Sequence, residues 1–261
     1  MSILGAVAVP HPPIILPEIG RGEEEKISAT TTAYLEISRR IVELNPDTII
    51  ITSPHSILYA DYFHISPGEA ATGNMAQFRA PQVKFAINYD TDFVKKLSAD
   101  AMSAGVPAGV LGERNPNLDH GTMVPLYFLQ RAGLDFDRVK FLRIGLSGLS
   151  NAIHYKFGQI ISRAADELGR RIFFVASGDL SHKLKGSHYG TVPEGAEFDS
   201  QVMENLGGAN FLQLLTMDNK ICSRAAECGL RSFWIMAGAL DKKSVRAEKL
   251  SYEGTFGVGY G

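Results

Sequence analysis

The sequence predicts an α/β fold in a single domain, with a mostly parallel central sheet and helices on both faces. The first observation is a set of apolar, β-branched runs, several of them apolar at nearly every position, as expected for strands buried on both faces. The second is that segments with helical periodicity fall between these runs, and such alternation favours a parallel sheet. The predicted strands lie at residues 3–9, 48–53, 83–88, 138–144 and 171–176.

Two segments have the apolar spacing of an amphipathic helix, residues 23–45 and 151–169. The first begins with the acidic residues Glu23 to Glu25, which suit the positive end of the helix dipole. Three stretches lack clear periodicity and are rich in Gly, Pro, Asn and His, and loops of such length are often functional. These loops are predicted at residues 66–82, 106–121 and 183–196, and a closing strand is predicted in the final segment 250–261.

Composition narrows the class of protein. The chain has 261 residues, 45% of them hydrophobic and 21% charged, which fits one domain over residues 1–261. The formal net charge of -2 leaves no basic surplus for nucleic acid. No run reaches the roughly 18 apolar residues of a membrane span, and we expect no membrane partner and a cytoplasmic location. The spacing of Cys222 and Cys228 fits neither a metal knuckle nor a disulfide framework.

Three of the seven histidines, His11, His55 and His182, follow directly on predicted strands. Open α/β sheets build their sites where the strands end, at the carboxyl edge of the sheet. Imidazole is the commonest metal-binding side chain and exchanges protons near neutral pH. Histidines gathered at one sheet edge therefore predict a metal or acid–base site, and an enzyme.

His11 and His55 have the rigid settings that metal ligands need. Pro12 and Pro13 follow His11 and hold the backbone extended, and Pro54 precedes His55. Ser53, Ser56 and Asp179 are candidates to orient the imidazoles. Either histidine alone also fits a residue that ends a strand, whereas two in the same arrangement favour a shared ligand role.

A site with two histidines needs a third anchor, and a carboxylate is the usual one when the metal is Fe(II). Glu227 is the first candidate, because it lies three residues before Leu230 on the apolar stripe of the last predicted helix. A carboxylate on a packed face is costly unless it is paired. The alternative is a frayed first turn in which Glu227 meets water or Arg224, and Glu253 is the second candidate ligand.

Two further histidines are candidates for catalysis. His182 follows a turn-like SGDLS stretch, and such surroundings suit a proton carrier better than a fixed ligand. His120 lies beside Asp119 at a predicted helix start, which would orient or charge it. Each also fits an ordinary loop histidine. His64, His154 and His188 are left without a role. The chain has no GxGxxG motif after a strand and no phosphate-binding GxxxxGK[ST] loop, so no nucleotide cofactor is indicated.

Five stretches together resemble the class III extradiol ring-cleavage dioxygenase family, also called LigB-like. They are VPHPP at 9–13, SPHS at 53–56, DHGTMVPL at 119–126, ASGDLSH at 176–182 and AAECGLRSFWIMAGAL at 225–240. The resemblance spans nearly the whole chain in the same order. It implies that His11, His55 and Glu227 bind a non-haem Fe(II), that His182 is the general acid/base, and that His120 helps to bind or polarise substrate.

The resemblance also implies the reaction and its partners. The protein would open a catecholic or aminophenolic ring with O2 at Fe(II). Zinc or another divalent metal could replace the iron in isolated protein. The resemblance also implies a homo-oligomer. A more distant resemblance to the Memo-like branch leaves a different function open. That branch has a cysteine where dioxygenases have the carboxylate, and here Cys228 follows Glu227 directly. The alternatives are a non-catalytic Memo-like metal- or peptide-binding protein and a zinc-dependent hydrolase.

Overall fold

The computed structural model describes residues 2–261 and has a central sheet of four strands in the order β1-β8-β2-β7. Every neighbouring pair in it is parallel, as predicted. The strands of this sheet are β1 (Ile3–Val9), β2 (Thr48–Ser53), β7 (Lys140–Gly145) and β8 (Ile172–Ser177). Short pairs lie outside it: β3 (Phe63–His64) with β6 (Ala108–Gly109), and β4 (Ala70–Met75) with β5 (Ala80–Asn88).

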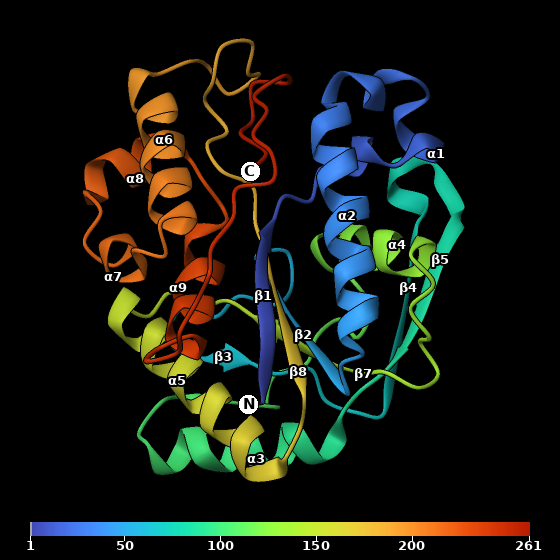
Figure 1. The fold of residues 1–261 in the computed structure, drawn as a ribbon, viewed down its shortest axis with the longest axis vertical. Helices are drawn as coiled ribbons and strands as arrows, with labels where there is room; N and C mark the ends of the chain where they lie inside the picture. The colour runs from blue at the N-terminus through green and yellow to red at the C-terminus, as the bar shows by residue number, and fades with distance from the viewer. Residues whose placement is uncertain (1) are drawn as a thin grey trace.

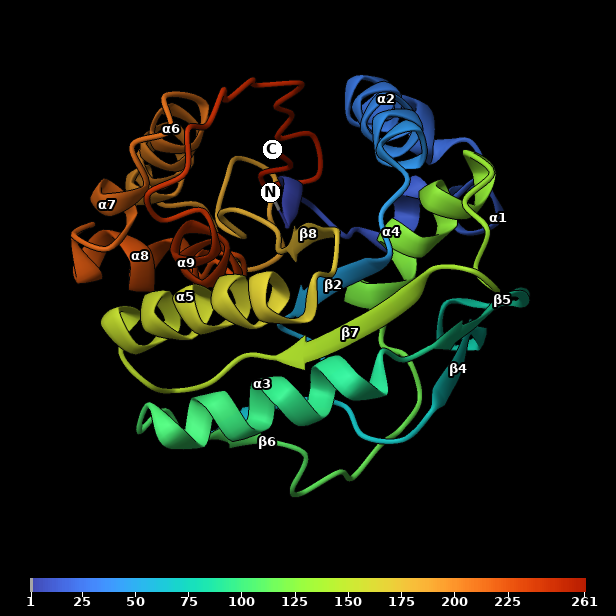
Figure 2. The ribbon, with the colours of Figure 1, turned by 60° about the horizontal axis from the view of Figure 1, so that its bottom comes forward.

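Helices cover both faces of this sheet, as predicted (Figures 1 and 2). The longer helices are α2 (Ser28–Leu44), α3 (Thr91–Ser103), α4 (His120–Arg131), α5 (Asn151–Leu168), α6 (Pro193–Gly207) and α9 (Leu230–Ala239). The short ones are η1 (Pro13–Ile15), α1 (Pro17–Gly20), η2 (Glu23–Ile27), η3 (Ala76–Phe78), α7 (Phe211–Leu214) and α8 (Asn219–Ala225). No helix among residues 2–261 is long and apolar enough to cross a membrane.

The alternation of side chains along the strands divides the core in two. Ile49 and Ile51 of β2 belong to the cluster under α2 and α4, whereas Ile50 belongs to the cluster under α3, α5 and α9. Successive side chains of a strand point to opposite faces, so a fully buried TIIITS run supplies both cores. Helices α5 and α9 cross where Gly158 of α5 meets the backbone of α9, and a methyl group there would overlap the Ile235 carbonyl.

Four predicted elements differ in the structure. Residues 66–82, predicted as a loop, contain β4 and the 3-10 helix η3. Residues 83–88 form a strand, but β5 pairs antiparallel with β4 in a hairpin outside the central sheet. The predicted helix 23–45 begins at Ser28, because residues 23–27 form the separate 3-10 helix η2. The final segment forms no closing strand: Glu253 and Tyr260 make an isolated antiparallel bridge, and Gly259 exchanges backbone hydrogen bonds with Leu180 and Ser181.

Candidate metal and catalytic site

Five polar side chains meet at the carboxyl ends of the central strands. His11 follows β1, His55 follows β2, and Asp179 follows β8. His120 is the first residue of α4, and Cys228 lies two residues before the start of α9. Because the strands are parallel, their carboxyl ends lie at one edge, where α/β proteins bind ligands. The strand-end histidines predicted from the sequence therefore lie at one place.

Hydrogen bonds fix the tautomer of His11. The hydroxyl of Ser177 donates to the Gly121 carbonyl at 2.6 Å, so its oxygen accepts from Nδ1–H of His11 at 2.9 Å. The Nε2 atom of His11 therefore carries a lone pair. Burial, followed by the nearby His55, lowers the pKa of His11 to about 3, so the ring is neutral at physiological pH.

The second imidazole faces this lone pair. Nε2 of His55 lies 3.0 Å from Nε2 of His11, and a single proton or a cation must lie between two such atoms. Burial also lowers the pKa of His55. The backbone amide of His55 donates to Ser53, whose hydroxyl donates to Asp119 at 2.5 Å. Ser53, a predicted orienting residue, therefore holds the backbone of His55 and the side chain of Asp119 rather than an imidazole ring.

His120 completes a group of three imidazoles. Its ring centroid lies 3.9 Å from that of His55 and 5.5 Å from that of His11. One nitrogen of each of these histidines lies within 4.8 Å of the others. Asp119 caps α4 by accepting from the Thr122 amide at 3.0 Å, which places His120 in the first turn. Burial and the neighbouring His55 lower the pKa of His120 to about 4.

Asp179 and Cys228 lie on the other side of His11. Oδ1 of Asp179 accepts from the His11 amide at 2.7 Å, and Oδ2 lies 3.9 Å from Nε2 of His11. The sulfur of Cys228 lies 3.7 Å from the same nitrogen. These three residues form a second set of donor atoms within 4.8 Å of one another. Burial raises the pKa of both the Asp179 carboxyl and the Cys228 thiol.

The carboxylate of Glu227 is not in either group of donor atoms found among residues 2–261. Its Oε2 accepts from the Leu230 amide at 2.7 Å, at the first turn of α9. Because α9 begins at Leu230 with Gly229 as its N-cap, the helical stripe does not continue back to Glu227. Burial raises the pKa of Glu227 to about 7. The side chain that this turn directs at His11 is that of Cys228.

His182 stands at the rim of the group. Its Nδ1 must donate to the Ala226 carbonyl at 2.7 Å, because a carbonyl only accepts, so Nε2 holds the lone pair of the neutral ring. That Nε2 lies 3.9 Å from Oδ2 of Asp179. The side chain is 22% exposed, which leaves it open to exchange protons with solvent.

A cavity of about 980 Å³ opens beside His55 and His120. Its other walls are the β4–β5 hairpin, of which residues 66–82 were predicted as a loop, and the loop before α4, which falls in the predicted loop 106–121. Lys84 and Asn74 of the hairpin and Asn117 of the loop make the lining polar. Glu253, the second candidate ligand after Glu227, lies elsewhere and accepts from the amide and hydroxyl of Thr30.

The remaining histidines have other surroundings. His64 contacts the Leu111 carbonyl and Glu113, His154 contacts the Ser150 carbonyl, and His188 is exposed. One site residue, Ser177, was missed from the sequence, and another, Asp179, was given only an orienting role. Ser177, the last residue of β8, orients His11, and Asp179 offers a donor atom as well as an orienting contact. Both follow from the rule that located the histidines, because both lie where a predicted strand ends.

The chain belongs to the LigB family. The family model described as the catalytic LigB subunit of aromatic ring-opening dioxygenase matches residues 5–261. Protein CA_C1420 of Clostridium acetobutylicum is 38% identical over 269 residues, covering 100% of this chain and 57% of that protein. The LigB domain of the present chain thus spans little more than half the length of this relative.

More distant relatives carry dioxygenase names. A 2,3-dihydroxyphenylpropionate/2,3-dihydroxicinnamic acid 1,2-dioxygenase of Rhodococcus is 26% identical, covering 72% of this chain and 59% of that protein. A 3,4-dihydroxyphenylacetate 2,3-dioxygenase of Escherichia coli is 23% identical, covering 66% and 64%. The crystal structure of uncharacterized protein JW3007 from Escherichia coli K12 has a TM-score of 0.55 at 16% identity, covering 87% of this chain and 92% of that one. This structural likeness concerns the fold.

Proposed function

We propose that this LigB domain is a non-haem Fe(II)-dependent extradiol dioxygenase that opens the ring of a catecholic or aminophenolic substrate with O2. The observation that carries the proposal is the pair of neutral imidazoles, His11 and His55, whose Nε2 atoms face each other 3.0 Å apart at the carboxyl edge of the sheet. The names of the dioxygenase relatives and of the family support the same kind of reaction.

The donor set fits a divalent metal. Metal-ligating imidazoles are neutral, and their second nitrogen is held by a hydrogen bond, as the Ser177 contact does for His11. The two Nε2 atoms, 3.0 Å apart, are close enough for both to bind one ion. His11 and His55 would hold the metal, with His120, Asp179 or Cys228 next to it. A bound Fe(II) would supply the redox centre at which the aromatic ring and O2 react.

The predicted ligand role of Glu227 stays a prediction. In the present conformation its carboxylate accepts from the Leu230 amide, and it would have to leave the first turn of α9 to reach His11. Asp179 is the carboxylate that already lies near Nε2 of His11. We therefore propose that Asp179 or Cys228, rather than Glu227, supplies the anionic donor.

His182 is suited to accept the proton of a substrate hydroxyl. The Ala226 carbonyl holds its Nδ1–H, so the proton goes to Nε2. The carboxylate of Asp179, 3.9 Å away, would stabilise the imidazolium that results. His120 is held neutral beside the cavity and offers a hydrogen bond to a substrate oxygen as negative charge develops on it.

The position of Cys228 favours a second function, Memo-like metal binding without ring cleavage. Thiolate ligands select zinc or copper, whereas a two-histidine, one-carboxylate set suits Fe(II). The sulfur of Cys228 lies 3.7 Å from Nε2 of His11, and in the present conformation Cys228 shares a donor group with His11 and Asp179 rather than with His55. The zinc-dependent hydrolase, the homo-oligomer and the cytoplasmic location stay predictions.

Anaerobic reconstitution with Fe(II), followed by oxygen uptake, tests the proposal. The panel is catechol, protocatechuate, gallate and an aminophenol, and the product is followed by its visible absorbance. The proposal expects oxygen consumption and a yellow product with at least one substrate. It expects the variant His182→Phe to keep its iron but to turn over substrate about 10²- to 10⁴-fold more slowly. Stoichiometric binding of zinc or copper, with no oxygen uptake across the panel, would establish the metal-binding function instead.

A further inference from the structure

The two edges of the central sheet are protected differently. The outer edge of β7 accepts from the backbone amides of Ser66 and Asp90, at 3.0 and 2.9 Å. The other edge is β1, which pairs only with β8. Among residues 2–261, no backbone hydrogen bond joins the outer side of β1 to another segment. Edge strands with free amides and carbonyls are templates for an added strand, and proteins ordinarily cover them.

The free groups belong to alternate residues of β1. Val9 directs its carbonyl at the Gly178 amide on the β8 side. Because successive backbone groups of a strand point to opposite sides, Ala8 and Ala6 direct theirs outward. Residues 4–8 are all partly exposed, so this edge is accessible.

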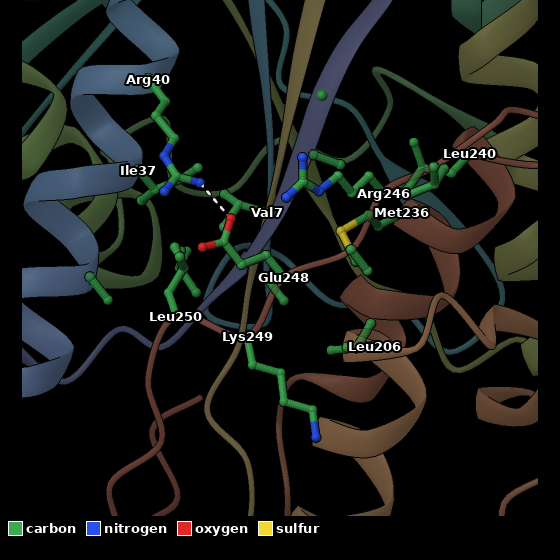
Figure 3. A pocket seen from close by; sticks show the side chains of 18 of the residues that line it. Val7, Ile37, Arg40, Leu206, Met236, Leu240, Arg246, Glu248, Lys249 and Leu250 are labelled. Atoms are coloured by element: carbon green, nitrogen blue, oxygen red, sulfur yellow. Dashed lines mark hydrogen bonds and ion pairs between the residues drawn. The ribbon is translucent and has the colours of Figure 1, made fainter.

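A groove of about 450 Å³ runs along this edge (Figure 3). One wall is α2, with Ile37 and Arg40, and the floor is β1, with Val7. The other wall is α6 and α9 together with the segment 243–251, which follows α9 and has no regular structure. Residues 244–251 make no backbone hydrogen bond within the described chain. The groove therefore lies between the outer edge of β1 and the backbone of residues 244–251, and neither makes a backbone hydrogen bond across it within the described chain.

The charged side chains of the groove are mostly positive. Its lining includes the cations Arg40, Lys243, Arg246 and Lys249 and one acidic side chain, Glu248. Glu248 pairs with Arg40 at 2.9 Å, while Arg246 and Lys249 are exposed and have no ion pair in the described chain. In Figure 3, Arg40 lies on the α2 side of the strand, where it pairs with Glu248, and Arg246 lies on the opposite side. A cationic groove in a chain of net charge -2 selects an anionic occupant.

We propose that this groove binds an extended, acidic peptide segment of a partner protein, which adds to the sheet as a strand beside β1. The peptide backbone would pair with Ala6 and Ala8, as in other strand-addition interfaces. Its alternate apolar side chains would pack on walls such as Ile37, Leu206 and Met236, and its acidic side chains would meet Arg246 and Lys249. This site is separate from the histidine cluster, and the proposal does not depend on the metal or on ring cleavage.

Selection from a random decapeptide phage library on the immobilised protein tests this proposal. We expect enriched peptides in which apolar and acidic residues alternate. A labelled synthetic copy should lose at least tenfold in affinity for the double variant Arg246→Glu/Lys249→Glu. The matched control is Lys95→Glu/Arg138→Glu, which makes the same charge change at exposed sites outside the groove and should bind as wild type.

The backbone contribution is tested on the peptide itself, so that protein folding is not affected. Two peptides are compared, one N-methylated at its odd-numbered residues and one at its even-numbered residues. Only one of these two registers removes the amide hydrogens that face β1, and we expect that peptide to bind at least tenfold more weakly. Three results would overturn the proposal: no enriched peptide, binding unchanged by the Arg246/Lys249 variant, or binding unchanged by N-methylation in both registers. Dodecanoate serves as a probe for fatty acids. If it binds saturably and no peptide is enriched, the groove binds a fatty-acid carboxylate instead, and the peptide proposal is overturned.

Discussion

The sulfur of Cys228 lies 3.7 Å from Nε2 of His11, while the carboxylate of its neighbour Glu227 accepts from the Leu230 amide. The chain therefore presents a thiol, and not the adjacent carboxylate, to the buried imidazole of His11. Thiolate and carboxylate donors favour different ions, so this contact gives a test of which metal the site would take.

We predict that Cys228→Ser weakens zinc binding by at least tenfold, whereas Glu227→Gln changes it by less than threefold. The serine removes the soft donor beside His11, and the glutamine keeps an oxygen that accepts from Leu230. Competition with a chromophoric chelator measures both affinities. The reverse order of effects would instead establish Glu227 as the ligand and would require the first turn of α9 to rearrange.

The hydrogen bond from His11 to Ser177 is expected to tune the metal site. In Ser177→Ala, Nδ1–H of His11 loses its buried acceptor, so the ring is free to change tautomer or to turn. Loss of such an outer contact costs about 10- to 100-fold in metal affinity. Isothermal titration with the metal measures this loss. Ser56→Ala is the control, since the Ser56 hydroxyl is buried without a hydrogen-bond partner, and unchanged affinity in Ser177→Ala would contradict the prediction.

Asp199 should make stability depend on pH. Its carboxylate accepts from the Ser181 amide at 2.7 Å and from the Tyr252 hydroxyl at 2.8 Å, and burial raises its pKa from 3.8 to about 6. A carboxyl group with a raised pKa binds more protons in the folded state than in the unfolded state between these two values. Its contribution to stability is therefore present below pH 4 and is lost as pH rises through 6.

The measurement is the free energy of unfolding of wild type and Asp199→Asn, in chelator, from pH 4 to 7. Asparagine keeps an acceptor for Ser181 and does not titrate. Wild type should lose stability relative to the variant as pH rises over this range. Parallel curves, or a relative gain by wild type, would mean that Asp199 is not the group responsible.

The crossing of α5 and α9 depends on Gly158. A methyl group there would overlap the Ile235 carbonyl and approach the Ala239 nitrogen to 2.7 Å, so backbone must move. We expect Gly158→Ala to destabilise the protein by about 1–3 kcal/mol in urea unfolding. Gly207→Ala is the control, because its new methyl group meets only the flexible side chain of Lys249. Equal stability of the two variants would show that the helices separate easily.

The parts of the fold predicted best are those with strong local signals. The run TIIITS is apolar enough to be a strand buried on both faces, and β2 has those bounds. The histidines at strand ends could be predicted to lie close together, because parallel strands end at the same edge of the sheet. Residues 83–88 were assigned correctly as a strand, but its partner β4 lies in a Gly- and Asn-containing stretch without an apolar pattern. The hairpin was therefore missed.

The choice between Glu227 and Cys228 depended on where α9 begins. Extending the apolar stripe three residues back from Leu230 placed Glu227 on the packed face, whereas the structure has a non-helical turn before Leu230. The start of a helix is set by capping contacts, and here the capping side chain is Glu227 itself. Periodicity alone does not reveal which of two adjacent polar residues takes that role.

The stoichiometry of Fe(II) bound anaerobically by wild type and by His11→Ala tests the central claim most directly. If His11 and His55 form a metal centre, wild type binds one ion per chain and the variant binds none at the same free iron concentration. Equal binding by both proteins, or none by wild type, would contradict the metal centre on which the proposed ring cleavage depends.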